Sequence, residues 1–279
     1  MGRVKAGGRA GGTGLSVKTR IRALRWVTVL ALLLVLEALP RAGLVRPATL
    51  EPVSVIFLRL GEILSTGTIP SPYFARAGSP TLASHLSATL GSILVSYAGA
   101  VLIGTPAGVL LWRLPTLARV LQPYLVVYYA LPIFALYPLF ILLFGTGFLP
   151  IVLLGFLFGV VVVVVNTALG LRRVDEEIYP KVGRSLGLRP VQMYLSIYLP
   201  GAAPYMFSGW KLAFVYSTIS VIASEFLISV RGLGHVIDRS YRNFETANMY
   251  AAILLVIGGV MLANSLLTWV ERRLYTRIE

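Results

Sequence analysis

The sequence contains no cysteine, and this absence excludes several kinds of chemistry. Disulfides, thiolate metal sites and cysteine nucleophiles all require that residue. Acidic residues and histidines are also scarce, with 11 Asp and Glu and 2 His among 279 residues. For the histidines, His85 and His235, we predict solvated or capping roles rather than metal ligation. No metal site is expected.

Signatures of nucleotide binding and of catalysis are missing as well. The chain has no G-x-x-x-x-G-K-[ST] motif, so it does not bind ATP through a P-loop of its own. We interpret the acidic run Asp175-Glu176-Glu177 as the start of a helix, where acids complement the helix dipole. No catalytic residue and no cofactor is predicted, and the chain is not expected to be an enzyme.

Apolar residues are abundant instead. They make up 57% of the chain, and charged residues only 13%, against about 25% in a typical soluble protein. Helical spans of a bilayer need about 17–25 apolar residues. Six windows of that kind occur, at 24–44, 86–111, 120–144, 148–170, 206–228 and 250–270. The sequence therefore predicts an all-α membrane protein with six transmembrane helices.

The net charge of +14 reflects topology rather than nucleic-acid binding. Seven of the Lys and Arg residues lie in the first 25 positions. In the later loops, the number of basic residues is alternately high and low. Lys and Arg are retained on the cytoplasmic side of a membrane. Both termini are therefore expected in the cytoplasm, with residues 1–23 as a basic arm, and no nucleic-acid partner is expected.

The remaining segments are assigned from composition. Residues 45–85 are proline-rich and form the predicted outer loop, with an amphipathic stretch around Val53 to Leu64 on the membrane surface. A core that contains spans two to six is expected at 86–279. Span two carries small residues every fourth position, which favours packing within the chain over a subunit contact. They are Ser92, Ser96, Ala100, Gly104 and Gly108.

The loop between spans four and five is the most informative part of the chain. Pro180 and Pro190 each suit the first turn of a short helix, where a missing donor costs nothing. Gly187 lies between the two helices and is expected to supply a left-handed residue. Leu199-Pro200 is expected to end the second helix before the next span. A folded two-helix loop of this kind indicates contact with another protein, although a helix lying on the bilayer is an alternative.

The spacing within this loop resembles the EAA loop of binding-protein-dependent ABC importer permeases. Lys181-Val182-Gly183 stands in the place of E-A-A, and Gly187 follows after three residues. Ile197-x-Leu199-Pro200 follows after nine more. Lys181 departs from the motif in charge. The segments 131–139, 144–147, 223–227 and 232–234 are similar to the nitrate/sulfonate/taurine/bicarbonate-type subfamily.

The resemblance implies a homodimer of six-span subunits in the bacterial inner membrane, surrounded by lipid. Its partners would be two ATP-binding-cassette ATPase subunits and a periplasmic or lipid-anchored substrate-binding protein. The cargo would be a small, anionic, sulfonate- or nitrate-like solute. Residues 172–199 would form the coupling loop to the ATPase. Its expected site residues are Lys181, Gly183, Gly187, Leu188, Ile197, Leu199 and Pro200. The alternative function is an ATP-independent channel or secondary carrier.

A translocation pathway is expected along span five. At about 100° per residue, Lys211, Thr218 and Glu225 fall on one helical face, which should meet the central pathway or a polar partner. Snorkelling to the interfaces is the alternative for Lys211. Ser217, Ser220 and Ser224 fall on another face, suited to close packing. Pro132 and Phe134 in span three are also assigned to the pathway, although the prolines there suit kinked packing equally well.

Overall fold

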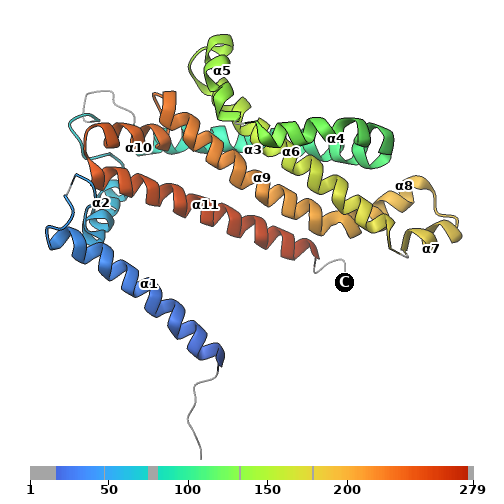
Figure 1. Cartoon of the computed structure of the whole chain (residues 1–279), viewed down its shortest axis with the longest axis horizontal. Coiled ribbons are helices and arrows are strands. Elements are labelled where there is room, and N and C mark those ends of the chain that lie inside the picture. Colours follow the sequence, from blue (N-terminus) through green and yellow to red (C-terminus); the bar gives the residue numbers. More distant parts are fainter. Residues whose placement is uncertain (1–16, 47, 75–80, 132, 178, 276–279) are drawn as a thin grey trace, which may run out of the picture.

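The computed structural model describes residues 17–46, 48–74, 81–131, 133–177 and 179–275, and within these ranges no residue is in a strand. The core consists of α3 (Leu82–Arg113), α6 (Phe148–Asp175) and α9 (Leu199–Ile228), packed side by side, with α11 (Thr246–Tyr275) against α9. Figure 1 shows these long helices running along one axis. The predicted all-α class is confirmed.

Small residues allow α3, α6 and α9 to approach closely. A Cβ atom on Gly104 of α3 would lie 2.8 Å from the Cβ of Val163, and one on Gly108 would lie 2.6 Å from that of Thr167. On α9, the Ser217 hydroxyl donates to the Gly155 carbonyl of α6 at 2.9 Å. Packing within the chain, predicted for the small residues of α3 and the serine face of α9, is confirmed. No larger side chain fits at these contacts.

Four helices of the described residues are long and apolar enough to cross a membrane, or five if a bent pair is one span. The four contain the predicted spans 86–111, 148–170 and 250–270, and all but the last residue of 206–228. The bent pair covers the predicted span 120–144. In it, α4 (Pro115–Ala130) meets η1 (Ile133–Leu136) and α5 (Tyr137–Phe144) at 80°. The prediction of six spans is thus confirmed only in part.

The predicted first span coincides with α1 (Val17–Arg41), which is not among those four helices. Figure 1 shows α1 leading away from the bundle, with its contact at α2 (Val53–Thr66). The Glu37 carboxylate accepts hydrogen bonds from the Ser54 amide at 3.0 Å and the Ser54 hydroxyl at 2.8 Å. Glu37 therefore caps the first turn of α2, where negative charge is favoured.

Two shorter helices cover the end of the bundle opposite the loop between α6 and α9 (Figure 1). The amphipathic stretch predicted at Val53–Leu64 is helical, as α2, and its Ile63 is buried against Leu82, Leu233 and Ala251. The segment between the last two spans contains α10 (Leu233–Arg242), which packs against α9, α11 and α3. This cap joins the ends of α3, α9 and α11.

Candidate functional site

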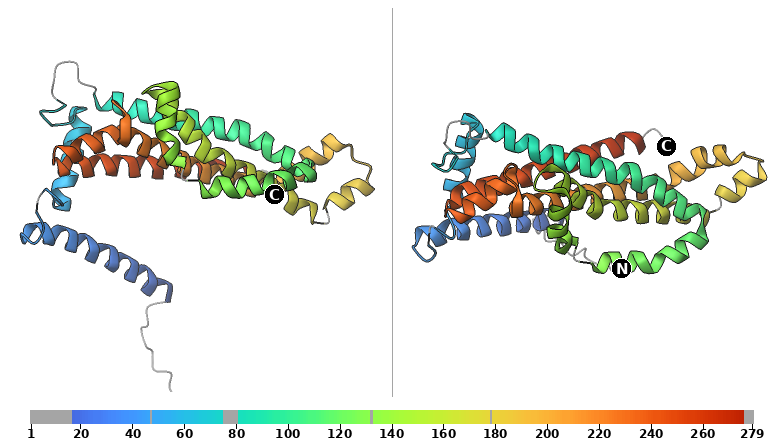
Figure 2. Two further views of the ribbon diagram at one scale, coloured as in Figure 1. Left: turned by 45° about the horizontal axis from the view of Figure 1, so that its top comes forward. Right: turned by 90° about the horizontal axis from the view of Figure 1, so that it is seen from above.

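The loop between α6 and α9 forms a finger of two short helices. These are α7 (Tyr179–Ser185) and α8 (Pro190–Met193), followed by the π-turn η2 (Tyr194–Tyr198). Both figures of the whole chain show α7 and α8 projecting beyond the end of the bundle (Figures 1 and 2). The starts predicted from Pro180 and Pro190 are confirmed. We call residues 176–198 the finger.

Gly187 closes α7 in the left-handed conformation, with φ of +71°. The Leu188 amide donates to the Gly183 carbonyl at 3.1 Å, and the Gly187 amide donates to the Arg184 carbonyl at 3.1 Å. These bonds form the pattern that usually ends a helix with glycine. The prediction for Gly187 is confirmed, and the turn folds α8 back beside α7.

Gly183 marks the closest approach between α7 and the segment that follows. A Cβ atom there would lie 2.6 Å from Cδ1 of Ile197 and 2.8 Å from Sδ of Met193. Leu188 and Ile197 pack against the buried cluster around Met193 and Tyr198 at the base of the finger. Gly183, Leu188 and Ile197 therefore hold the finger together, whereas Lys181 is exposed on its surface.

The tip of the finger exposes apolar side chains. Leu186 is 74% exposed and Val191 is 67% exposed, and both Tyr179 and Val182 are also open to solvent. Basic side chains surround them, with Lys181, Arg184 and Arg189 all exposed. Exposed apolar groups on a projecting, polar loop are typical of a surface that binds another protein.

Two expectations for this region are wrong. Leu199-Pro200 does not end a helix, because residues 190–227 form one helical run. The π-turn accounts for this continuity, since its widened turn relieves the clash that proline makes in an α-helix. The Leu199 amide closes the turn on the Tyr194 carbonyl. The acidic run also lies at the end of α6 and not at a helix start, with Asp175 as its last residue.

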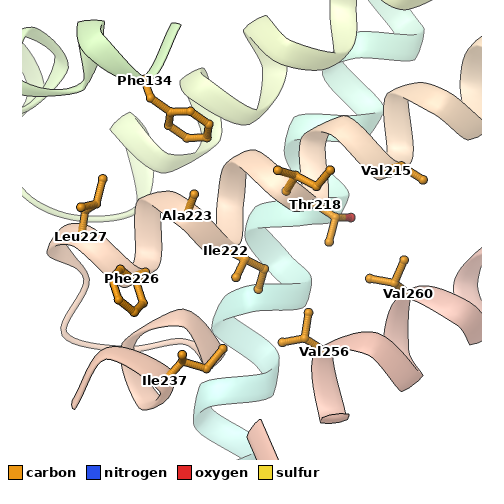
Figure 3. Close-up of a pocket in the computed structure, with 11 residues that line it drawn as sticks. Phe134, Val215, Thr218, Ile222, Ala223, Phe226, Leu227, Ile237, Val256 and Val260 are labelled. Carbon is orange, nitrogen blue, oxygen red and sulfur yellow. The ribbon is translucent and has the colours of Figure 1, made fainter. Parts of the chain in front are cut away.

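A groove runs beside the C-terminal half of α9, with a volume of about 530 Å³. Figure 3 shows Ile222 and Thr218 of α9 facing Val256 and Val260 of α11. Phe134 from η1 lies on the other side of α9. The residues that line the groove are apolar except for Thr218. Its hydroxyl donates to the Phe214 carbonyl at 2.7 Å. Pro132, the other predicted pathway residue of span three, lies outside the described residues.

Lys211 and Glu225, predicted on the face of Thr218, have polar partners on neighbouring helices. The Lys211 ammonium pairs with the Glu271 carboxylate of α11 at 2.6 Å. Glu225 is 1% exposed, and its Oε2 accepts from the Thr89 hydroxyl at 2.8 Å and the Gly234 amide at 3.0 Å. The sequence predicts that this face meets either the central pathway or a polar partner. Lys211 and Glu225 both have a polar partner within the chain.

The network around Glu225 includes residues that sequence reasoning missed. The Thr89 hydroxyl also accepts from the Leu233 amide at 2.8 Å, and the Gly232 amide donates to Nδ1 of His85 at 3.1 Å. His85 is fully buried, so a solvated role for it is wrong, but it does cap α10, whose N-cap is Gly232. The only sequence signal was the spacing Gly232-Leu233-Gly234. We call Thr89, Glu225 and residues 232–234 the outer latch, after the side of the membrane that the sequence predicts for this end of the bundle.

The rings of His85 and His235 stack at the edge of the outer latch, with centroids 6.1 Å apart. Burial, and then the nearby charge of Arg239, lowers the pKa of His235 below its usual value. A neutral imidazole is therefore favoured beside the buried His85. The stack helps to join α10 to α3 without placing a second charge near Glu225.

Residues 100–276, more than half of the chain, match the family described as the binding-protein-dependent transport system inner membrane component. The chain belongs to this family. The family match includes the finger, the groove-lining part of α9 and the outer latch apart from Thr89.

Individual relatives are transport permeases. The taurine transport system permease protein TauC of Escherichia coli is 27% identical over 231 residues, which are 81% of this chain and 82% of TauC. The nitrate import permease protein NrtB of Leptolyngbya laminosa is 30% identical over 40% of this chain and 39% of that protein. The chain thus spans about two fifths of the length of this nitrate relative.

Among solved structures, the inward-facing MetNI methionine ABC transporter shares the fold. The TM-score is 0.59 at 17% identity, covering 71% of this chain and 96% of that one. The likeness supports the arrangement of the core helices.

Proposed function

We propose that the chain is the membrane permease subunit of an ATP-binding-cassette importer. The observation that carries this proposal is the projecting finger, with its exposed apolar tip, in a member of the binding-protein-dependent transport family. The finger is the coupling loop, and Lys181, Leu186 and Val191 meet a groove on a separate ATPase subunit. Leu199 and Pro200, the first residues of α9, follow directly after the finger.

This geometry suits a mechanical lever. The π-turn and α9 continue from α8 without a break, so a displacement of the finger moves α9 as well. Closure of the ATPase pair would shift the finger and tip α6 and α9 between two arrangements. A rigid-body switch of this kind alternates access to the two sides of a membrane.

We further propose that two copies of the chain form the pathway between them. The groove beside Thr218 and Phe134 is then half of the pathway, the outer latch holds its outer end, and the Lys211–Glu271 pair holds α9 to α11. A binding protein delivers the cargo from outside. The relatives, named for taurine, nitrate and bicarbonate, support a small anionic cargo.

The test is assembly and transport with the cognate ATPase subunit. The chain is expressed with and without that subunit, purified in mild detergent and reconstituted in vesicles with its binding protein. We expect the ATPase to co-purify and uptake to require ATP. A chain that purifies as a lone oligomer and supports uptake without ATP would show the alternative, a channel or secondary carrier.

A matched cross-link tests the role of the finger. Because the chain has no cysteine, Leu186→Cys introduces a single thiol at the tip. It should cross-link to the ATPase, whereas Val230→Cys, 77% exposed beyond the end of α9, should not. Equal yields of the cross-link to the ATPase at both positions would contradict docking at the finger.

A further inference from the structure

Asp175, the last residue of α6, bonds two other elements at the base of the finger. Its Oδ1 accepts from the Tyr198 hydroxyl of η2 at 2.7 Å. Its Oδ2 accepts from the Trp112 indole of α3 at 2.6 Å. One carboxylate therefore joins α6, the start of α9 and the end of α3.

Aromatic packing fixes the geometry of both donors. The rings of Trp112 and Tyr198 lie 4.7 Å apart, and Tyr194 lies on the same side, 6.4 Å from Trp112. Tyr198 is buried in a cluster with Leu171, Val174, Ala202 and Met206. Rings that are held in this way present their donors without a further loss of side-chain freedom.

The position of Asp175 is unfavourable unless these bonds compensate for it. The C-terminal end of a helix carries partial negative charge, which disfavours an acid and favours the basic Arg172 and Arg173 of the same turn. Hydrogen bonds to an ionised acceptor are short and stronger than neutral ones. The two contacts of Asp175 therefore explain an acid at this place.

The two bonds differ in what they connect. The finger follows α6 and precedes α9 in the chain. The Tyr198 bond therefore connects the end of α6 to the residue just before α9. Helix α3 is not adjacent to the finger in the chain, and the Trp112 bond brings it to the same carboxylate. We propose that Asp175 is a positioning residue that makes α3 and α6 move with the finger and α9. This inference rests on the proposed function.

The experiment uses the full chain with its ATPase subunits and binding protein in vesicles, and measures ATP hydrolysis and uptake in the same preparation. Asp175→Asn keeps the size of the side chain but can accept on only one of the two atoms. We expect assembly and basal hydrolysis to persist while uptake per ATP falls about tenfold, the equivalent of about 1.4 kcal/mol. The neighbouring exposed acids provide matched controls, as Glu176→Gln and Glu177→Gln, and these should transport normally.

A second variant separates this role from simple stability. Tyr198→Phe keeps the ring and removes one donor, so it should lower uptake per ATP even if Asp175→Asn fails to fold. Combined with Asp175→Asn its effect should be less than additive, because both variants act on the hydrogen bonds of one side chain. Normal uptake per ATP in Tyr198→Phe would overturn this inference and leave the proposed function standing. A loss of uptake per ATP in Glu176→Gln as large as in Asp175→Asn would do the same. Failure of the native chain to assemble with the ATPase, or uptake without ATP, would overturn the proposed function and the inference with it.

Discussion

A substitution at Gly187 tests backbone strain without steric clash. A Cβ atom added there meets nothing within 4 Å, so only the backbone, at φ of +71°, resists a larger residue. We predict that Gly187→Val costs about 1 kcal/mol or more in the folded finger, because β-branched residues disfavour this conformation. Uptake should fall while the protein still reaches the membrane.

Gly187→Asn is the matched control, since asparagine tolerates the left-handed region. It should retain more uptake than Gly187→Val at equal membrane abundance, measured in the same vesicles. Equal transport by the two variants would mean that the conformation of Gly187 does not limit coupling.

At the outer latch, the hydroxyl of Thr89 donates to Glu225 and accepts from the Leu233 amide. We predict that Thr89→Val, which keeps the shape, lowers the free energy of unfolding by about 1–3 kcal/mol, because it leaves a buried carboxylate and amide without this partner. Thr89→Ser retains the hydroxyl and should be close to native. Thermal unfolding in detergent compares the variants, and identical midpoints for all three chains would argue against the network.

At the scale of the helix, α9 presents two faces with different surroundings. Thr218 lines the groove, with 3% of its surface exposed, whereas Ser217 and Ser220 are completely buried at 0%. We predict that Thr218→Cys reacts with a water-soluble maleimide at a rate that changes when ATP is added to the assembled transporter. Ser220→Cys should stay inert. Labelling at 220 with 218 unreactive would reverse the assignment.

The long helices were predictable because their signal is local. A window of apolar residues long enough to cross a membrane is readable without knowing its neighbours, and this found α3, α6, α9 and α11. The hinge at Gly187 was predictable for the same reason. Helix α10 was missed because it is short, charged and stabilised by packing against α9 and α11. Propensity alone does not reveal such a helix.

Errors in the finger and the outer latch have a common physical origin. Pro200 was expected to stop a helix, but the preceding π-turn accommodates it, and such a turn leaves no clear mark in the sequence. The partners of Glu225 and Asp175 lie at Thr89, Trp112 and other positions distant in the chain. Contacts of this kind depend on which helices are neighbours, which periodicity does not give.

At the scale of the whole molecule, the finger and the outer latch occupy opposite ends of the same helix. Helix α9 begins at Leu199, beside the finger, and ends at Ile228, just past Glu225. Because the π-turn and α9 are continuous, a movement at one end can reach the other without an intervening loop. Under the proposed function, ATPase closure and opening of the outer mouth are therefore linked through one rigid element.

The charge of the finger sets the last prediction, which concerns assembly with the ATPase. Lys181 is exposed, and with Arg184 and Arg189 it makes this surface basic. The groove of the ATPase should therefore be acidic or neutral where Lys181 meets it, because like charges across an interface are penalised. We predict that Lys181→Glu weakens binding to the ATPase about tenfold at low salt, or about 1.4 kcal/mol. The loss should shrink at high salt, where surface charges are screened.

Arg231→Glu is the control, because it changes the net charge equally on an exposed residue beyond the far end of α9. It should bind the ATPase as the native chain does. Lys181→Met separates loss of the charge from its reversal and should fall between native and Lys181→Glu. Equal affinity of the Lys181→Glu variant at low and high salt, measured by titration in detergent, would show that the charge at this place does not select the partner. A salt-dependent loss confined to position 181 would instead place that residue at the contact, since only charges close to the interface feel its local field.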